Sequence, residues 1–185
     1  MNMAKSPDTG LGHTILKRAA ISPLERAITF EGHTQTYVQL ALQVRKISAV
    51  LRDIGINKGD RVGYIGLNHP SFLEVLYACG CLGAIFVPIN YRLTAPEVRF
   101  IANDAGLKVI FADQMTISLV DQERFSLQCV RFVSIESRVS NWEFLPALTD
   151  NKDPLEHLEQ TSADDIALIM YTSGTTGLPK GAMLT

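Results

Sequence analysis

The sequence predicts an α/β fold: a mostly parallel β-sheet with helices on both faces. Three observations support this prediction. Between residues 36 and 112, segments with helical periodicity alternate with short apolar segments. The loops between them are short, and strand–helix–strand units joined in this way form a parallel sheet through right-handed crossovers. The apolar segment 84–89 is rich in β-branched and aromatic residues, which is typical of a strand buried on both faces.

The first elements surround a turn near the N-terminus. Residues 11–20 have weak helical character, and residues 27–31 are a short strand candidate that ends at Gly32. From Thr36 onward, apolar residues recur near the helical period. Gly55 then provides a suitable C-terminal cap, so this segment is predicted to be one long helix.

The next elements repeat the alternation. Residues 61–67 are predicted to form a strand, and Asn68 is expected to cap the following helix. Pro70 suits an early position of that helix, which would run to about residue 82. Residues 84–89 would then turn directly into the next strand.

A capping box at residues 94–97 precedes another apolar helical face, which Gly106 ends. Residues 108–112 are predicted to form the strand that follows it. This strand completes the regular part of the pattern.

The rest of the chain is patterned less clearly. A helix is expected within 114–123 and a strand within 129–135, and residues 137–159 resemble a turn-rich surface connection. Residues 166–171 are a continuous apolar run, which predicts a buried strand. The pair Asp164–Asp165 before this strand is expected to be solvated rather than metal-binding.

Composition excludes several classes of protein. The chain has 185 residues, 46% of them hydrophobic, and a formal net charge of -2, which is typical of a globular domain without general affinity for nucleic acid. An odd number of cysteines without zinc-site spacing predicts buried, reduced thiols rather than disulfides. The three cysteines are Cys79, Cys81 and Cys129.

No segment predicts secretion or a membrane span. Residues 1–10 are polar, without an apolar signal core, and are expected to form a flexible N-terminus of a cytoplasmic protein. The apolar run 75–89 is shorter than the roughly 20 residues that a spanning helix needs. Peripheral contact with a membrane and the oligomeric state are left open.

The remaining polar residues are expected to have structural roles. Arg92 is expected to pair with Glu97 or to contact a neighbouring loop. The histidines show no metal spacing and are expected at the surface or as helix caps. They are His13, His33, His69 and His157.

The segment after residues 166–171 predicts a phosphate-binding loop. Its glycines allow tight backbone bends, its hydroxyl groups and amides can donate to an anion, and Lys180 adds a positive charge suited to phosphate. It is not a Walker A loop, because Lys180 lies between Pro179 and Gly181. A solvent-exposed turn is the alternative, but the position after a strand is where open α/β sheets bind ligands. The expected binding residues are Thr172, Ser173, Gly174, Thr175, Thr176, Gly177 and Lys180.

Residues 171–185, YTSGTTGLPKGAMLT, resemble the signature loop of the acyl-adenylate-forming superfamily. Residues 87–113 resemble the acyl-CoA synthetase version of the corresponding region, and the similarity extends over nearly the whole chain. The resemblance implies an acid–thiol ligase that binds ATP with Mg²⁺ and uses CoA as co-substrate. A carboxylic acid, by this resemblance a medium- to long-chain fatty acid, would form acyl-AMP and then acyl-CoA.

The resemblance also implies that much of the site is missing. In the family, the adenine- and ribose-binding residues, the Mg²⁺-binding acid and the catalytic lysine of the C-terminal domain follow this loop, so Lys180 is not that lysine. We therefore expect residues 11–185 to be a partial AMP-binding N-terminal domain, truncated after the loop and inactive alone. Two alternatives remain open: an adenylation domain for another carboxylic acid, and a non-catalytic remnant that binds a partner.

Overall fold

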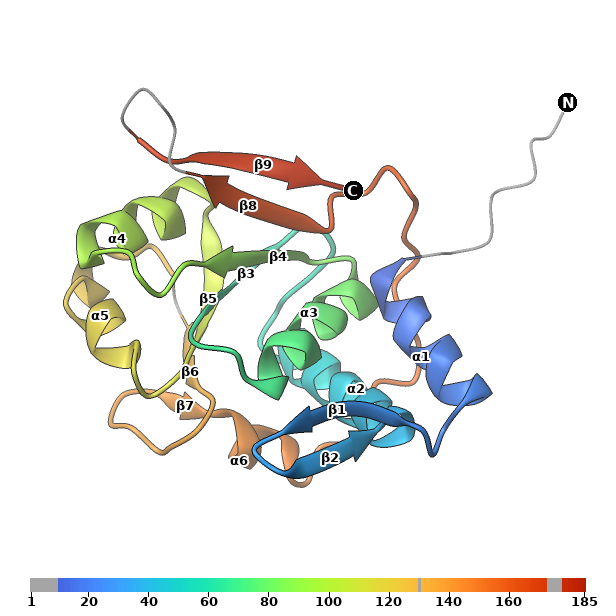
Figure 1. Ribbon diagram of the computed structural model, residues 1–185. Coiled ribbons are helices and arrows are strands. Elements are labelled where there is room, and N and C mark those ends of the chain that lie inside the picture. Colours follow the sequence, from blue (N-terminus) through green and yellow to red (C-terminus); the bar gives the residue numbers. More distant parts are fainter. Residues whose placement is uncertain (1–9, 130, 173–177) are drawn as a thin grey trace, which may run out of the picture.

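The fold is described from a computed structural model over residues 10–129, 131–172 and 178–185. Within these ranges, seven strands form one sheet in the order β7-β6-β5-β3-β4-β8-β9 (Figure 1). All neighbouring strands are parallel except β8 and β9, which are antiparallel. The strands are β3 (Arg61–Ile65), β4 (Ile85–Ile89), β5 (Leu107–Ala112), β6 (Arg131–Ser134), β7 (Glu143–Phe144), β8 (Leu168–Thr172) and β9 (Lys180–Leu184).

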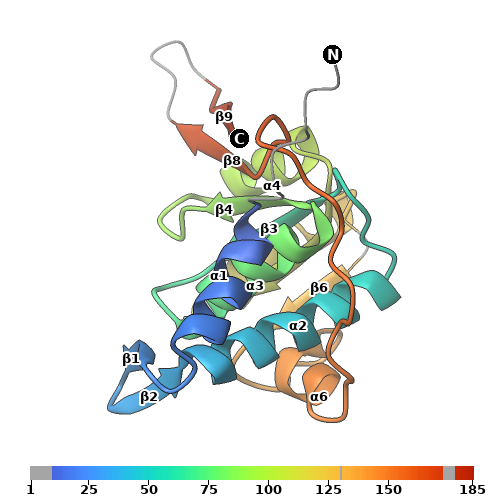
Figure 2. The ribbon, with the colours of Figure 1, turned by 90° about the vertical axis from the view of Figure 1, so that its right-hand side faces the viewer.

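Helices cover both faces of this sheet, so the predicted fold class is confirmed. Alternation along β3 sends Tyr64 to one apolar cluster and Ile65 to the other. The first cluster contains buried residues of α1, α2 and α3, and the second contains those of α4 and α5. Figure 2 shows α1, α2 and α3 lying side by side on one side of the sheet. The helices are α1 (Leu11–Ile21), α2 (Tyr37–Asp53), α3 (Pro70–Leu82), α4 (Ala95–Asp104), α5 (Ile117–Asp121) and α6 (Leu145–Thr149), with a 3₁₀ turn at Arg124–Ser126.

A two-stranded antiparallel hairpin of β1 (Arg26–Phe30) and β2 (His33–Thr36) stands apart from the main sheet. It lies beside α2, at the end of the molecule opposite β8 and β9 (Figures 1 and 2). Gly32 occupies the turn with a φ of 81°, a conformation that favours glycine. The predicted turn at Gly32 is therefore confirmed.

Capping explains where the central helices begin. Glu97 closes the predicted capping box, because its Oε2 accepts a hydrogen bond from the backbone N–H of Thr94 at 2.8 Å. For α3, the predicted N-cap residue was wrong by one position. His69, not Asn68, is the N-cap, and its Nδ1 accepts from the backbone N–H of Ser71 at 3.2 Å.

Two expectations for residues 114–159 need correction. The helix expected within 114–123 is only α5, because Asp113 Oδ1 accepts from the backbone N–H of Thr116 and holds residues 113–116 in a turn. The connection 137–159 is not all turn, since it contributes β7 and α6. Leu145 and Trp142 from this stretch are buried against the sheet.

The prediction that residues 166–171 form a buried strand was half right. β8 is a strand, but all of its residues are half-buried or exposed, and Met170 is 45% exposed. The reason lies outside the strand: its neighbour β9 is exposed along its whole length, so β8 lies near an open end of the sheet.

The expectations for cysteines and membrane spans agree with the structure. Cys79, Cys81 and Cys129 are buried free thiols, and burial raises the pKa of Cys81 and Cys129 to about 11. The apolar run 75–89 becomes the end of α3 and the strand β4. Among the described residues, no helix has the length and apolarity needed to cross a membrane.

Candidate functional site

The described part of the predicted loop is its base. Thr172 is the last residue of β8, Lys180 is the first residue of β9, and the two are partners in the β-ladder. The antiparallel pairing therefore brings these two predicted site residues together across the hairpin. The other predicted residues, Ser173, Gly174, Thr175, Thr176 and Gly177, lie outside the described residues, as do residues 1–9 of the expected N-terminal segment.

This base lies at the carboxyl edge of the parallel strands. β8 pairs in parallel with β4, which pairs with β3, which pairs with β5. Thr172 therefore ends its strand at the same edge as Ile89, Ile65 and Ala112. Open α/β sheets bind their ligands at this edge, so the position matches the one expected for a binding loop.

Tyr171 anchors the strand just before the loop. Its hydroxyl donates a hydrogen bond of 2.5 Å to Oδ2 of Asp104, the last residue of α4. Burial raises the pKa of Tyr171, and the nearby carboxylate of Asp104 adds to this effect, so the phenol remains a proton donor. The end of β8 is thus tied to α4 as well as to β4.

Gly181 allows β9 to lie close to this anchor. A Cβ atom at position 181 would lie 2.7 Å from Cγ2 of Ile169 and 3.1 Å from Cζ of Tyr171. A larger residue would require the side chain of Ile169 or Tyr171 to move. The glycine after Lys180 therefore leaves room for the side chains of Ile169 and Tyr171 beside β9.

Lys180 is exposed, and no described carboxylate lies within salt-bridge distance of it. By contrast, Lys58, Lys108 and Lys152 each pair with an aspartate. An ammonium group that is not neutralised by the described part of the protein can attract an anionic ligand. This is the electrostatic property that the predicted site requires.

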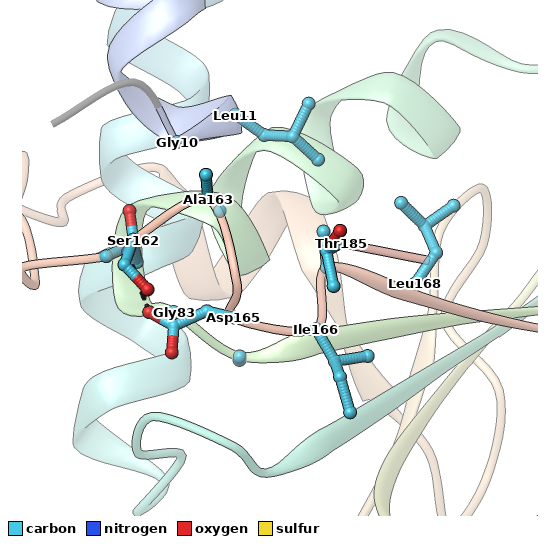
Figure 3. Close-up of a pocket in the computed structure, with 13 residues that line it drawn as sticks. Gly10, Leu11, Gly83, Ser162, Ala163, Asp165, Ile166, Leu168 and Thr185 are labelled. Carbon is cyan, nitrogen blue, oxygen red and sulfur yellow. Dashed lines mark hydrogen bonds between the residues drawn. The ribbon is translucent and has the colours of Figure 1, made fainter. Parts of the chain in front are cut away.

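A cavity of about 310 Å³ lies at the other end of β8, away from this base. Figure 3 shows Gly83, Ile166 and Leu168 on its wall, near the amino end of the strand and close to Thr185. Because β8 runs from Leu168 to Thr172, this cavity and the loop base lie at opposite edges of the sheet. The cavity therefore does not belong to the predicted phosphate site.

An ion pair holds the loop before β8. Oδ2 of Asp165 lies 2.6 Å from Nζ of Lys58 and accepts from the backbone N–H of Ser162 at 2.8 Å. The hydrogen bond from Lys58 is the main cause that lowers the pKa of Asp165. Asp164 is exposed, and no cluster of three metal-binding side chains occurs in the described ranges. The expectation of solvated carboxylates holds for Asp164, whereas Asp165 is engaged in an ion pair.

Arg92 does not pair with Glu97, because the carboxylate of Glu97 is engaged in the capping box. Instead, Nε of Arg92 donates to the hydroxyl of the adjacent Tyr91 at 3.2 Å. One histidine, His69, has the capping role expected for this residue type. Sequence reasoning missed the Tyr171–Asp104 anchor, because nothing in either local pattern links residues 67 positions apart.

Comparison with known proteins gives consistent matches along the chain. A model of the family described as "AMP-binding enzyme" matches residues 16–185. The feruloyl-CoA synthase of Amycolatopsis sp is 40% identical over 176 residues, which are 95% of this chain and 33% of that protein. The long-chain-fatty-acid–CoA ligase FadD13 of Mycobacterium tuberculosis is 35% identical over 181 residues, covering 95% of this chain and 35% of that protein.

A solved structure matches as well. The inhibitor-bound N-terminal domain of FACL13 from Mycobacterium tuberculosis superposes with a TM-score of 0.83 and 32% sequence identity. The match covers 94% of this chain and 44% of that domain. The chain thus spans about a third of the length of the curated relatives it matches.

Proposed function

Because this chain belongs to the family of AMP-binding enzymes, we propose that it is the N-terminal part of an acid–thiol ligase. The complete enzyme would activate a carboxylic acid with ATP and transfer the acyl group to CoA. This chain would contribute the loop that binds the triphosphate. The isolated segment would have no ligase activity.

The observation that carries this proposal is the placement of Thr172 and Lys180. The two residues face each other across β8 and β9, at the carboxyl edge of the parallel strands. The chain between them carries Ser173, Thr175 and Thr176, whose hydroxyl groups suit phosphate oxygens.

The proposed reaction has two steps. A carboxylate oxygen attacks the α-phosphorus of ATP, the bond to the β-phosphate breaks, and pyrophosphate leaves with the electron pair. The thiol of CoA then attacks the carbonyl carbon of the acyl-AMP, and AMP leaves. In the first step an anion approaches a polyanion, so the protein has to neutralise charge and hold the reacting groups in line.

Within this scheme, Lys180 and the hydroxyl and amide donors of the loop would bind the β- and γ-phosphates. Thr172 and Lys180 would hold the two ends of the loop, while Gly174 and Gly177 would provide its bends. The role of this segment is to bind and orient pyrophosphate as a leaving group. No described residue acts as a general acid or base in the proposal.

Mg²⁺ would accompany the triphosphate in the complete enzyme. The part of the chain that the structure describes contains no cluster of three or more Asp, Glu, His or Cys side chains that could hold a metal ion. In the proposal, this segment orients the phosphate oxygens that share the metal ion.

The acid substrate is proposed to be a medium- to long-chain fatty acid; the relative FadD13 is named a long-chain-fatty-acid–CoA ligase. An aromatic acid is the second candidate, favoured by the higher identity to a feruloyl-CoA synthase. Assays of the complete enzyme with palmitate and with ferulate separate the two: turnover of ferulate but not palmitate would contradict the first choice.

A non-catalytic role as an interaction fragment is a further candidate. It is favoured by the exposure of β9, where Met183 is 65% exposed. Large exposed apolar residues on a strand at the end of a sheet invite association with another chain.

The proposed function is tested in a chimaera in which this chain replaces the matching third of FadD13. We expect the chimaera to release pyrophosphate when fatty acid, ATP and CoA are present, because the loop of this chain would serve the host enzyme. A folded chimaera that binds the fatty acid but not ATP would contradict the proposal. In the same assay the isolated chain should show no turnover.

A further inference from the structure

A second cavity lies between the β1–β2 hairpin and the helices α2 and α3, at the end of the molecule opposite the β8–β9 hairpin (Figures 1 and 2). Its volume of about 630 Å³ falls within the range of small-molecule sites. Gln35 and Glu74 contribute polar groups, and Ile28, Phe30 and Leu42 contribute apolar surface. None of these residues belongs to the proposed phosphate site.

Glu74 is a buried carboxyl group in a helix that is otherwise mainly apolar. The residue is only 8% exposed, and it lines the cavity from α3. Nε2 of Gln35 donates to its Oε1 at 3.1 Å, the one side-chain hydrogen bond to Glu74 among the described residues. Burial raises the pKa of Glu74, and the hydrogen bond from Gln35 only partly opposes this. Buried carboxylates are normally stabilised by more donors or by a cation.

The side-chain amide of Gln35 also carries an acceptor, its oxygen, that has no hydrogen-bond donor in the described part of the chain. Oε1 of Gln35 is buried, and no described group donates a hydrogen bond to it. Gln35 comes from the hairpin and Glu74 from α3, so the two hydrogen-bonded side chains join two elements that line the cavity. Among the described residues, Oε1 of Gln35 has no donor and the carboxyl of Glu74 has only the one from Gln35, which indicates that a ligand rich in N–H groups would complement them.

We propose that this cavity binds a primary ammonium group on a short aliphatic stem. Its N–H groups would donate to the carboxylate of Glu74 and to Oε1 of Gln35. The stem would pack against the apolar side chains of Phe30 and Leu42. Such a cation supplies both the charge and the three donors that these acceptors lack.

The lining of the cavity carries both signs of charge, and its buried charged group is the carboxyl of Glu74. Lys46 also lines the cavity, but its Nζ donates to the backbone oxygen of Asp150 at 3.4 Å, beyond the end of α6. Glu31, in the exposed turn of the hairpin, adds a second carboxylate at the rim. An anion would meet Glu74, and a purely apolar ligand would leave Oε1 of Gln35 without a donor.

The test is a titration of the purified 185-residue chain with n-butylammonium chloride, followed by the NMR signals of the Gln35 side-chain amide. We expect saturable binding. Tetramethylammonium, which has the charge but no N–H group, and n-butanol, which has the stem but no charge, should not bind at the same concentrations. Nα-acetyl-lysine amide distinguishes the source of the ammonium: tighter binding than n-butylammonium indicates a lysine of a peptide, and weaker binding indicates a small amine.

Variants test whether Glu74 and Gln35 bind the ammonium group. Glu74→Gln keeps the size of the side chain and should weaken n-butylammonium binding at least tenfold, and Gln35→Met should also weaken it. Glu31→Gln is the matched control, since it removes the same charge from the exposed rim, and it should change affinity less than twofold. The proposal is overturned if n-butylammonium does not bind, if tetramethylammonium binds equally well, or if Glu74→Gln binds as tightly as the unaltered chain.

Discussion

At the scale of single residues, the chain places two charged groups in contrasting environments. Lys180 is exposed at the start of β9, where its charge is available to a ligand. Glu74 is buried within α3 with one hydrogen bond from Gln35. The first arrangement suits binding, and the second lowers the stability of the fold whenever the carboxyl is ionised.

Glu74→Gln is therefore expected to stabilise the protein at neutral pH. The raised pKa means that the folded state holds the proton more tightly than the unfolded state, so stability falls as pH rises from the usual value of 4.5 through the raised one. An amide at this position removes that loss and can donate to Gln35, a gain of about 1 kcal/mol.

Thermal unfolding at pH 7 and pH 4 measures this effect. The melting temperature of Glu74→Gln should exceed that of the unaltered chain at pH 7 and approach it at pH 4. Glu31→Gln, which removes a charge from an exposed turn, should have little effect at either pH. A lower melting temperature for Glu74→Gln at pH 7 would show that the carboxylate is well stabilised in the fold.

At the scale of elements, α1 and α3 make an unusually close contact. A Cβ atom on Gly80 would lie 2.6 Å from the backbone nitrogen of Gly12 and 2.8 Å from Cβ of Leu11. On the other side, a Cβ on Gly12 would lie 2.6 Å from the backbone nitrogen of Cys81. These two glycines let the helices touch through their backbones, which explains why an apolar helix such as α3 contains one.

The substitution Gly80→Ala tests this contact, because the contact decides whether the free energy of unfolding rises or falls. Helix propensity alone favours alanine by about 1 kcal/mol. The contact with backbone atoms opposes this, because α1 cannot yield as a flexible side chain could, and overpacking of this kind costs about 1–3 kcal/mol. We expect a net destabilisation of about 1 kcal/mol in urea unfolding; an increase in stability would mean that α1 shifts without cost.

Most elements could be predicted from the sequence, because their periodicity and caps are local. The helices and strands between Thr36 and Ala112 follow apolar spacing, and Glu97 marks the start of α4. Burial of β8 could not be predicted in this way. A continuous apolar run resembles a buried strand, whereas its exposure depends on how few elements pack beside it.

The candidate site was predictable only in part. Its residue types and its position after a strand are local features, and the pairing of Thr172 with Lys180 agrees with them. The contacts that hold the base are not local: Tyr171 reaches Asp104 on α4. Phosphate binding by Ser173 to Gly177 stays a prediction, since these residues lie outside the described ranges.

At the scale of the whole molecule, the two ends of the sheet differ. The end formed by β6 and β7 is covered in part by Trp142, whose ring packs edge-on against Phe132 at 5.4 Å. At the other end, β9 is exposed throughout, and its outer edge has no partner strand among the described residues. Edges of this kind pair with other chains unless a charge or a bulge prevents it.

The isolated chain is therefore expected to self-associate through β9 as its concentration rises. Met183→Lys should reduce this association in sedimentation velocity, because a charged edge disfavours strand pairing. Met115→Lys is the matched control: Met115 is 74% exposed but lies outside the strands, so association should persist. A chain that stays monomeric at high concentration would contradict the prediction.

Binding of the triphosphate by the segment from Thr172 to Lys180 is measured by ATP–pyrophosphate exchange with the FadD13 chimaera. Lys180→Met should lower kcat/KM for ATP by about tenfold or more, since it removes a charge-assisted contact worth roughly 1.5–3 kcal/mol. Lys152→Met, which removes a lysine already paired with Asp53, should leave the exchange unchanged. Equal exchange rates for the chimaera with and without Lys180→Met would contradict the claim.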